Sequence, residues 1–308
     1  MGRENIFHKV LWAVDPFVSD YSLQNTVAKI LKVFSRTFSF SIHPVSVVLA
    51  DQTPYLVGKD SSVETFANQV EAKINGWLSQ LALTSIEPVT LRIEPEFSIR
   101  SAVRNILTLF EKNSYTVIVA STHAKKRKEE VDLGTFSETL LLLSQAPVFL
   151  VPPQFEVPDK FTEIFYPTDL SLNSLATLKS LVPLASALDA EITLFHKMIS
   201  FAKDIVDFPY SSDARSNYLE QLHDSSASEL QKLVTQLQNF GIRSQFIIDR
   251  IEADYTSKSI AQHAQSKKGR IIALVSHSTP RTFSLPGSVT RQVVRCTSLP
   301  ILILQPEK

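Results

Sequence analysis

Two short motifs in this chain combine a glycine with a hydroxyl residue at the predicted start of a helix. Gly134-Thr135 and Gly287-Ser288 lie 153 residues apart. Glycine lets a bound group come close to the backbone, and the N–H groups that open a helix attract anions. A phosphate group is therefore the ligand that both motifs would suit. The chain holds only seven glycines, so two in matched contexts indicate an internal repeat.

Two further landmarks recur at the same interval. Asp15 closes an apolar run and has its counterpart in Asp169, 154 residues later, while Pro147 is matched by Pro300, 153 residues later. An aspartate after a strand commonly accepts hydrogen bonds from neighbouring turn amides, and it can also contact a ligand. Landmarks that keep register over this distance indicate one domain written twice.

Composition limits the class of protein. The 308 residues suit two domains, which we place at 1–152 and 161–308 with a linker over 153–160. Acidic and basic residues number 31 each, so there is no global attraction to nucleic acid or anionic membranes. No apolar run reaches the ~20 residues of a membrane span, and a single cysteine suits a reducing compartment. We expect a cytoplasmic protein without a nucleic-acid or membrane partner.

Apolar runs of strand length alternate with segments of helical period in both halves. In the first half, strands are expected near 8–14, 45–50, 89–93, 116–120 and 148–151. In the second half, they are expected near 163–167, 191–196, 244–248, 270–275 and 301–304. Helices of the second half fall near 172–188, 214–240, 253–266 and 288–296, and Pro183 should kink the first of these.

This alternation predicts an α/β fold. We expect two tandem doubly wound parallel five-stranded sheets, Rossmann-like, with strand order 3-2-1-4-5 and helices on both faces. Ligands of such sheets bind beyond the carboxyl ends of the strands, where the strand order reverses. Asp15 and the loop 121–134 would meet at that point in the first half. Asp169 and the loop 276–287 would meet there in the second.

The repeated pattern resembles the universal stress protein family in its tandem, two-domain form. The resemblance rests on the aspartate after strand one, in Ala13-Val14-Asp15 and Pro167-Thr168-Asp169, on the two Gly-Ser/Thr pairs and on the last apolar strands. It implies ATP or another adenine nucleotide as the candidate cofactor, although the family also has members that bind none. It further implies that the two aspartates could hold a ribose or a bound cation.

The loops that would hold the phosphates depart from the family pattern. Family members that bind ATP carry Gly-x2-Gly-x9-Gly-Ser/Thr after strand four, and here Ser121 and Ala124 stand at the first two glycine positions. Alignment on the strand end puts Ser276 and Thr279 at these positions in the second half, within a shorter loop. Small residues impair the approach of a phosphate rather than abolish it, and any position that needs positive φ would be strained by about 1 kcal/mol or more. The first half, with its loop length intact, is the better candidate.

Other residues that could bind a ligand or take part in catalysis also have ordinary structural explanations. The basic run at 125–128 could contact phosphates or form a solvated loop. His123 and His277 follow strand four, but no nucleophile with a predictable partner accompanies them, and the histidines show no metal-ligand spacing. Cys296 is expected on an apolar helix face in the core. We expect neither a conventional enzyme nor a metal site, while weak ATP hydrolysis stays open.

Two functions are compatible with these observations. In the first, the chain is a non-catalytic stress-response or regulatory protein that acts mainly through protein partners, its nucleotide loops having degenerated. In the second, at least one half binds an adenine nucleotide. The last strands of the two halves would be sheet edges, and they could pair across an internal pseudo-twofold axis or between the chains of a homodimer.

Overall fold

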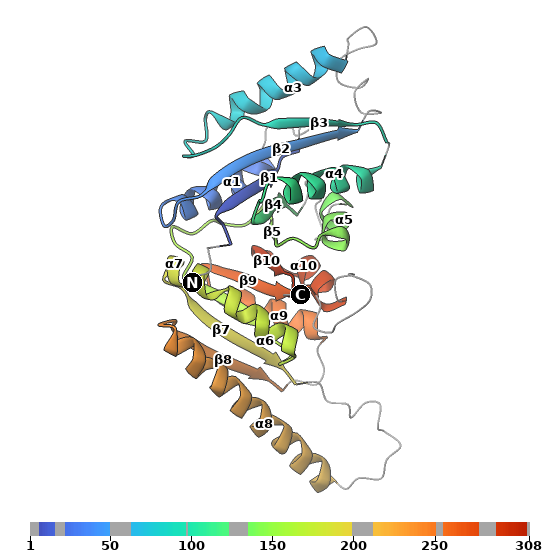
Figure 1. Cartoon of the computed structure of the whole chain (residues 1–308). Helices are drawn as coiled ribbons and strands as arrows, with labels where there is room; N and C mark the ends of the chain where they lie inside the picture. Colours follow the sequence, from blue (N-terminus) through green and yellow to red (C-terminus); the bar gives the residue numbers. More distant parts are fainter. Residues whose placement is uncertain are drawn as a thin grey trace.

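The structure is a computed structural model of the chain, and it describes residues 6–15, 22–49, 63–96, 98–122, 135–198, 212–250, 255–276 and 288–306. Strands and helices alternate along both halves (Figure 1). The described elements of the first half are β1 (Lys9–Ala13), α1 (Ser22–Ser35), β2 (Ser41–Leu49), α3 (Val63–Leu78), β3 (Thr90–Glu94), α4 (Ile99–Lys112), β4 (Val117–Ser121), α5 (Thr135–Leu143) and β5 (Val148–Val151).

The second half repeats this order. Its described elements are β6 (Glu163–Pro167), α6 (Leu172–Ser180), α7 (Val182–Leu188), β7 (Glu191–Lys197), α8 (Ser212–Asn239), β8 (Ser244–Asp249), α9 (Thr256–Gln265), β9 (Arg270–Val275), α10 (Ser288–Cys296) and β10 (Ile301–Leu304). The helix expected over 172–188 is divided into α6 and α7. Pro183 lies in the first turn of α7, where its missing N–H removes no helical hydrogen bond.

The ten strands of the described residues form one continuous sheet, in the order β3-β2-β1-β4-β5-β10-β9-β6-β7-β8. Within each half the order is the predicted 3-2-1-4-5, which confirms the α/β fold. The two five-stranded units are not separate sheets, however, because β5 and β10 pair antiparallel, with Leu302 opposite Phe149. Each of these apolar strands removes the free edge of the other. The pairing is the internal pseudo-twofold arrangement, and it lies at the centre of the molecule (Figure 1).

Each face of the sheet has its own core, because successive strand residues point to opposite faces. Val10 and Trp12 of β1 belong to a cluster that includes residues of α1, α3, α6, α7 and α8. Leu11 and Ala13 belong to a second cluster, with residues of α4, α5, α9 and α10. Both clusters contain residues of both halves. Coverage on two faces explains why the central strands are apolar throughout.

The segment expected as a linker, 153–160, is packed against both halves. The Thr26 hydroxyl of α1 donates to the Pro153 carbonyl (2.7 Å). The ring of Phe155 stacks on Phe161, with ring centroids 6.1 Å apart, and Phe161 also lies 5.4 Å from Phe34 of α1. The connection between the halves therefore contributes to the core.

One glycine lies inside a helix without a steric reason. In the part of the chain that the structure describes, no atom outside the local helix lies within 4 Å of the place where Gly76 of α3 would carry a Cβ. Since glycine is about 1 kcal/mol less favourable than alanine inside a helix, we expect Gly76→Ala to raise the free energy of unfolding by about 0.5–1 kcal/mol in urea denaturation. Gly241→Ala is the matched control and should be destabilising, because Gly241 has a φ of 77°. A lower stability of the Gly76 variant would contradict this reading of α3.

Candidate functional site

The sheet places the predicted residues where its strand order reverses. β1 lies between β2 and β4, and β6 lies between β7 and β9. Asp15 follows β1 and Ser121 ends β4, while in the second half Asp169 follows β6 and Ser276 follows β9. Parallel neighbouring strands have their carboxyl ends on the same side of the sheet. Asp15 and Ser121 therefore lie on one such side, and so do Asp169 and Ser276. This is the position that topology assigns to a ligand.

In the first half, one bond between backbone groups and one from a side-chain hydroxyl hold the described ends of β1 and β4. The Val14 N–H donates to the Val45 carbonyl (2.8 Å), which fixes the chain at Asp15. Ser121 is buried, and its carbonyl accepts a hydrogen bond from the Ser137 hydroxyl of α5 (2.8 Å). The start of α5 is thereby tied to the end of β4.

Only part of the predicted set can be placed. Thr135 is exposed at the start of α5, and Ser288 begins α10. The remaining predicted glycine-position and helix-start residues lie outside the described residues: Ala124, Gly134, Thr279 and Gly287. The same holds for His123, His277 and the basic run 125–128. Their role as ligand contacts stays a prediction.

Asp169 has a structural role in the turn between β6 and α6. Its Oδ1 accepts the N–H of Ser171 (3.1 Å), which closes an Asx turn. The Ser171 hydroxyl in turn accepts the N–H of Ser174 (3.3 Å) and caps α6. This is an ordinary structural role for an aspartate after a strand, and the carboxylate performs it while remaining exposed.

A network of buried hydroxyl groups lies beneath this turn. Tyr166 donates to the Ser174 carbonyl (2.6 Å), and the hydroxyls of Ser174 and Thr168 are hydrogen-bonded to each other (2.9 Å). His196 Nδ1 lies 2.9 Å from the Thr168 carbonyl. Burial raises the pKa of Tyr166, so its phenol stays neutral and donates. Sequence reasoning missed this network, although Thr168, just after β6, is two residues from Tyr166, the spacing at which side chains of an extended chain point to the same side.

Hydrogen bonds from the last helix of each half give a structural alignment of the two halves. Ser137 of α5 donates to the Ser121 carbonyl (2.8 Å). Thr290, at the same place in α10, donates to the Val275 carbonyl (3.0 Å). Val275 is therefore the structural counterpart of Ser121.

A second pair of bonds agrees with this alignment. The N–H of Thr122 donates to the carbonyl of Val151, the last residue of β5 (3.0 Å). The N–H of Ser276 donates to the carbonyl of Leu304, the last residue of β10 (2.8 Å). Ser276 therefore corresponds to Thr122, one residue beyond the place that the sequence alignment assigns to it. Val275, rather than Ser276, therefore matches Ser121, which the sequence alignment puts at the first glycine position.

Ser276 is hydrogen-bonded to a side chain that reaches the other half. Its hydroxyl, in a residue only 1% exposed, donates to Gln305 Oε1 (2.5 Å). Gln305 Nε2 donates to the carbonyl of Ser144, just after α5 (3.0 Å). We call the place where the strand order of each half reverses its switch point. The side-chain amide of Gln305 thus links the switch point of the second half to the first half. The counterpart of Gln305 in the first half is Pro152, which has no side-chain amide.

We expect Gln305→Leu to lower the free energy of unfolding by about 1–3 kcal/mol, because two buried oxygen atoms lose a hydrogen-bond partner. Urea denaturation measures the difference. Gln305→Glu keeps the acceptor for Ser276 and loses the donor for Ser144. Its free energy of unfolding should therefore lie between those of the original chain and the leucine variant. A leucine variant as stable as the original chain would show that this link contributes no net stability.

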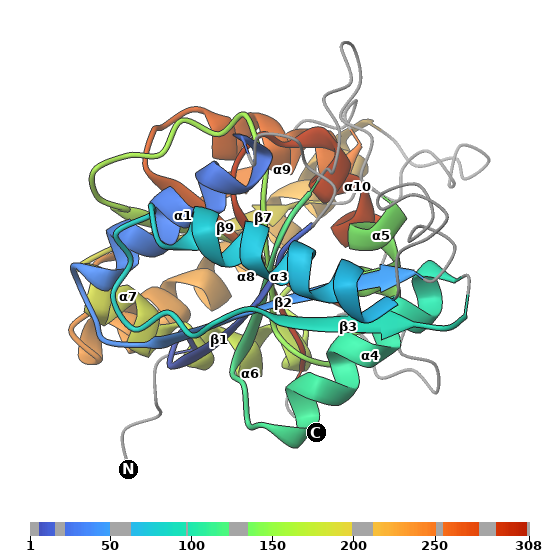
Figure 2. The same ribbon diagram turned by 90° about the horizontal axis from the view of Figure 1, so that it is seen from above.

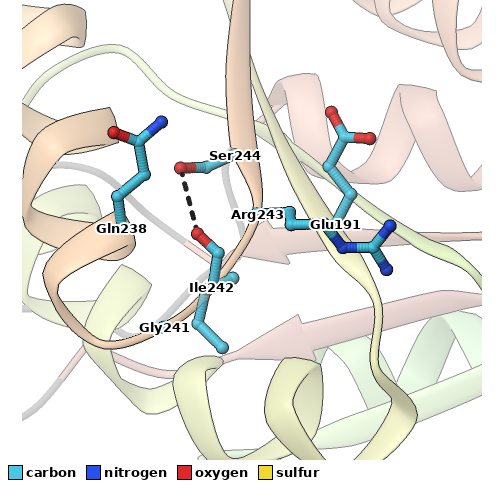
Figure 3. Close-up of a pocket in the computed structure, with 6 residues that line it drawn as sticks. All are labelled: Glu191, Gln238, Gly241, Ile242, Arg243 and Ser244. Carbon is cyan, nitrogen blue, oxygen red and sulfur yellow. Dashed lines mark hydrogen bonds between the residues drawn. The ribbon is translucent and has the colours of Figure 1, made fainter.

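A pocket lies on the opposite side from the candidate site, at the amino ends of the strands β7 and β8 (Figure 3). It is lined by the end of α8, its connection to β8 and the starts of β7 and β8: Glu191, Gln238, Gly241, Ile242, Arg243 and Ser244. The Ser244 hydroxyl donates to the Ile242 carbonyl (3.5 Å), and Arg243 Nη2 donates to the Asp189 carbonyl (2.7 Å). The pocket contains none of the predicted site residues.

Within the described ranges, no helix has the length and apolar character needed to cross a membrane. No group of three or more His, Cys, Asp or Glu side chains in these ranges could hold a metal ion. Cys296 is exposed rather than buried, which corrects the expectation of a core cysteine. The buried stripe of α10 instead passes through Val293 and Val294.

No protein-family model matches this chain, and no curated protein matches it in sequence. Solved structures do match over nearly its whole length. A functionally unknown protein from Pseudomonas aeruginosa PAO1 has a TM-score of 0.64 at 11% identity, covering 97% of this chain and 93% of its own. A universal stress protein from Archaeoglobus fulgidus DSM 4304 has a TM-score of 0.62 at 14% identity, covering 99% of both chains. The chain has the fold of the tandem universal stress proteins.

Proposed function

We propose that this chain is a tandem universal stress protein that acts without catalysis, in the cytoplasm, through protein partners. The observation that carries the proposal is that polar side chains at the second switch point already have partners within the chain. Asp169 is bonded to the Ser171 N–H, and Ser276 is bonded to Gln305. A nucleotide would have to replace these bonds, and an exchange of hydrogen bonds gives little net free energy.

The backbone of the second switch point is also poorly suited to a phosphate. Glycine allows close approach and positive φ, whereas Val275, at the first glycine position, is branched at Cβ. A phosphate cradle needs converging backbone N–H groups that the ligand can reach. We infer that the second half does not bind a nucleotide.

Binding of an adenine nucleotide by the first half is the second candidate. Ser121, small and unbranched, occupies the position that Val275 takes in the second half, and the loop after it keeps the family spacing. Thr135 is exposed at the start of α5, where helix N–H groups attract a phosphate. Asp15 and Gly134 complete the candidate set, and Ala124 is its weakest member because it replaces a glycine.

Mass spectrometry of small molecules released from the purified, denatured protein tests the proposal without presupposing a ligand. We expect no adenine nucleotide. Calorimetry with ATP, ADP and AMP, each with and without Mg²⁺, should likewise show no heat of binding. A nucleotide recovered in amounts close to one per chain would reject the main proposal in favour of the second candidate.

Two matched variants then locate any binding that is found. Gly134→Val crowds the helix start of the first half, and Gly287→Val does the same in the second. If the first half binds the nucleotide, the heat disappears in the Gly134 variant and persists in the Gly287 variant. The reverse pattern would contradict the assignment of the second half as the non-binding one.

A further inference from the structure

The ion pairing between α5 and α10 is asymmetric, although the two helices are repeats. They lie side by side at the junction of the halves (Figures 1 and 2). Glu138 of α5 forms an ion pair with Arg295 of α10. Each helix residue has its counterpart 153 positions away, so the pseudo-twofold axis maps this pair onto Arg291 and Leu142. The second place for an ion pair thus holds an arginine opposite a leucine.

Arg291 lacks a counter-ion among the described residues. Its Nε–H is buried and has no hydrogen-bond partner, while the residue as a whole is partly exposed. A buried donor left unpaired destabilises the folded state. Such groups are uncommon in folded proteins. The described residues therefore leave the guanidinium of Arg291 without an anion, while part of the side chain stays accessible.

The place of Arg291 along its helix strengthens this conclusion. It is the fourth residue of α10, whose first turn has no acidic residue. The positive end of a helix dipole disfavours a cation there and favours an anion. At the same position α5 carries Glu138, as the dipole prefers. The helix itself thus gives Arg291 no stabilisation, whereas an external carboxylate would be attracted by both the dipole and the guanidinium.

The surroundings of Arg291 indicate which anion would bind. Val289, two residues earlier, is 37% exposed, and Leu142 is partly exposed. Together α5 and α10 carry two arginines and one glutamate. Guanidinium is weakly hydrated and binds a carboxylate through two parallel hydrogen bonds, so it suits interfaces that are partly apolar. A face that is apolar and positive complements a partner that is apolar and acidic.

We propose that the exposed face of α5 and α10 is a docking surface on which Arg291 binds a carboxylate from an acidic segment of a partner protein. The carboxylate takes the place opposite Arg291 that Glu138 takes opposite Arg295. The inference deepens the proposed function and rests on it, because it names the chemistry by which a partner is recognised.

The geometry can be tested without a partner. Leu142→Glu puts a carboxylate where the pseudo-twofold axis predicts one, and Leu142→Gln is the neutral control. At low salt, the unfolding equilibrium constant of the Glu variant should be about threefold smaller than that of the Gln variant, as for a partly exposed ion pair. The difference should vanish when Arg291→Met is added. Equal constants for the Glu and Gln variants would overturn the proposed position of the carboxylate.

Docking itself is tested on the full chain labelled with ¹⁵N-arginine, by following the Nε–H resonance that Arg291→Met removes. The probes are a short peptide of leucine and glutamate, its glutamine counterpart and inorganic phosphate. The glutamate peptide should shift the resonance at concentrations where the other two do not, and Leu142→Glu should abolish the shift. Arg243→Met, which alters an exposed arginine elsewhere, should leave it unchanged.

Two results would overturn the docking proposal. A shift caused by phosphate at or below the peptide concentration would indicate a small-anion site instead. No shift with any probe would show that the face does not bind carboxylates. Neither result affects the search for bound nucleotide, so failure of the docking surface and failure of the proposed function can be distinguished.

Discussion

Arg270→Ala is expected to lower the free energy of unfolding by about 3–5 kcal/mol. Arg270 begins β9 and is 1% exposed; its Nη2 lies 2.8 Å from Glu163 Oε1. Its Nη1 donates to the carbonyls of His263 and Ala264 at the end of α9. Removing the guanidinium leaves a buried carboxylate without its closest cation and two helix-end carbonyls without their donor. Breaking one side of a buried ion pair is costly for this reason.

Urea denaturation monitored by fluorescence makes this a test of coupling as well. Both tryptophans, Trp12 and Trp77, are in the first half, whereas Arg270 is in the second. Since the sheet is continuous, the fluorescence transition should shift to lower urea. The control is Arg243→Ala, which removes an exposed ion pair to Asp189 and should cost less than about 1 kcal/mol. Equal effects of the two substitutions would contradict a structural role for the buried pair.

The loss in free energy of unfolding caused by Arg270→Ala should depend on pH. Burial by itself raises the pKa of Glu163, but hydrogen bonds from Arg270 and Thr193 and the charges of Arg270 and Lys267 outweigh it, so the pKa is lowered. A carboxyl with a lowered pKa stabilises the fold above its unfolded pKa, and this contribution is lost as the pH falls through the folded pKa. The stability difference between the two proteins should therefore be largest near neutral pH and narrow below about pH 4.

The elements of this fold could be predicted because their pattern is local. Strands covered on both faces are continuous apolar runs, and in helices the apolar residues recur every three to four positions. The main error lies in β2, which begins at Ser41 rather than near 45 and contains Pro44, paired with Trp12 of β1. Proline has no N–H to donate and is rare in central strands. The sequence therefore favoured a later start.

The position of the candidate site could be predicted, but its internal bonds could not. The repeat places Asp15 and Asp169 at the strand ends, since a topological rule needs only the order of the elements. The bond from Ser276 to Gln305 depends on the spatial meeting of two strand ends, and the pair of Glu138 with Arg295 joins residues 157 positions apart. No local period encodes such contacts. The loop before Gly287 is also shorter, so the second half can be aligned only on the end of its fourth strand, and the sequence does not mark that end to within one residue.

Phe149→Ala is expected to cost about 3–5 kcal/mol, the range for a large aromatic side chain removed from a core. Phe149 of β5 has no exposed surface and is paired with Leu302 of β10 across the junction. Its ring lies edge-on to Phe7, with centroids 5.2 Å apart, and 5.9 Å from Phe34. Phe34 in turn lies 5.4 Å from Phe161, just before β6. The ring therefore belongs to an aromatic cluster that joins the halves.

This substitution distinguishes a unified molecule from two linked domains. The backbone pairing of β5 with β10 does not depend on the ring, so transitions followed by tryptophan fluorescence and by far-UV circular dichroism should shift together to lower urea. Phe240→Ala, at a side chain that is 60% exposed, should leave both nearly unchanged. If only the fluorescence transition moved while the circular dichroism split into two steps, the halves would unfold independently. Joint movement is the outcome that a shared core across the antiparallel junction requires.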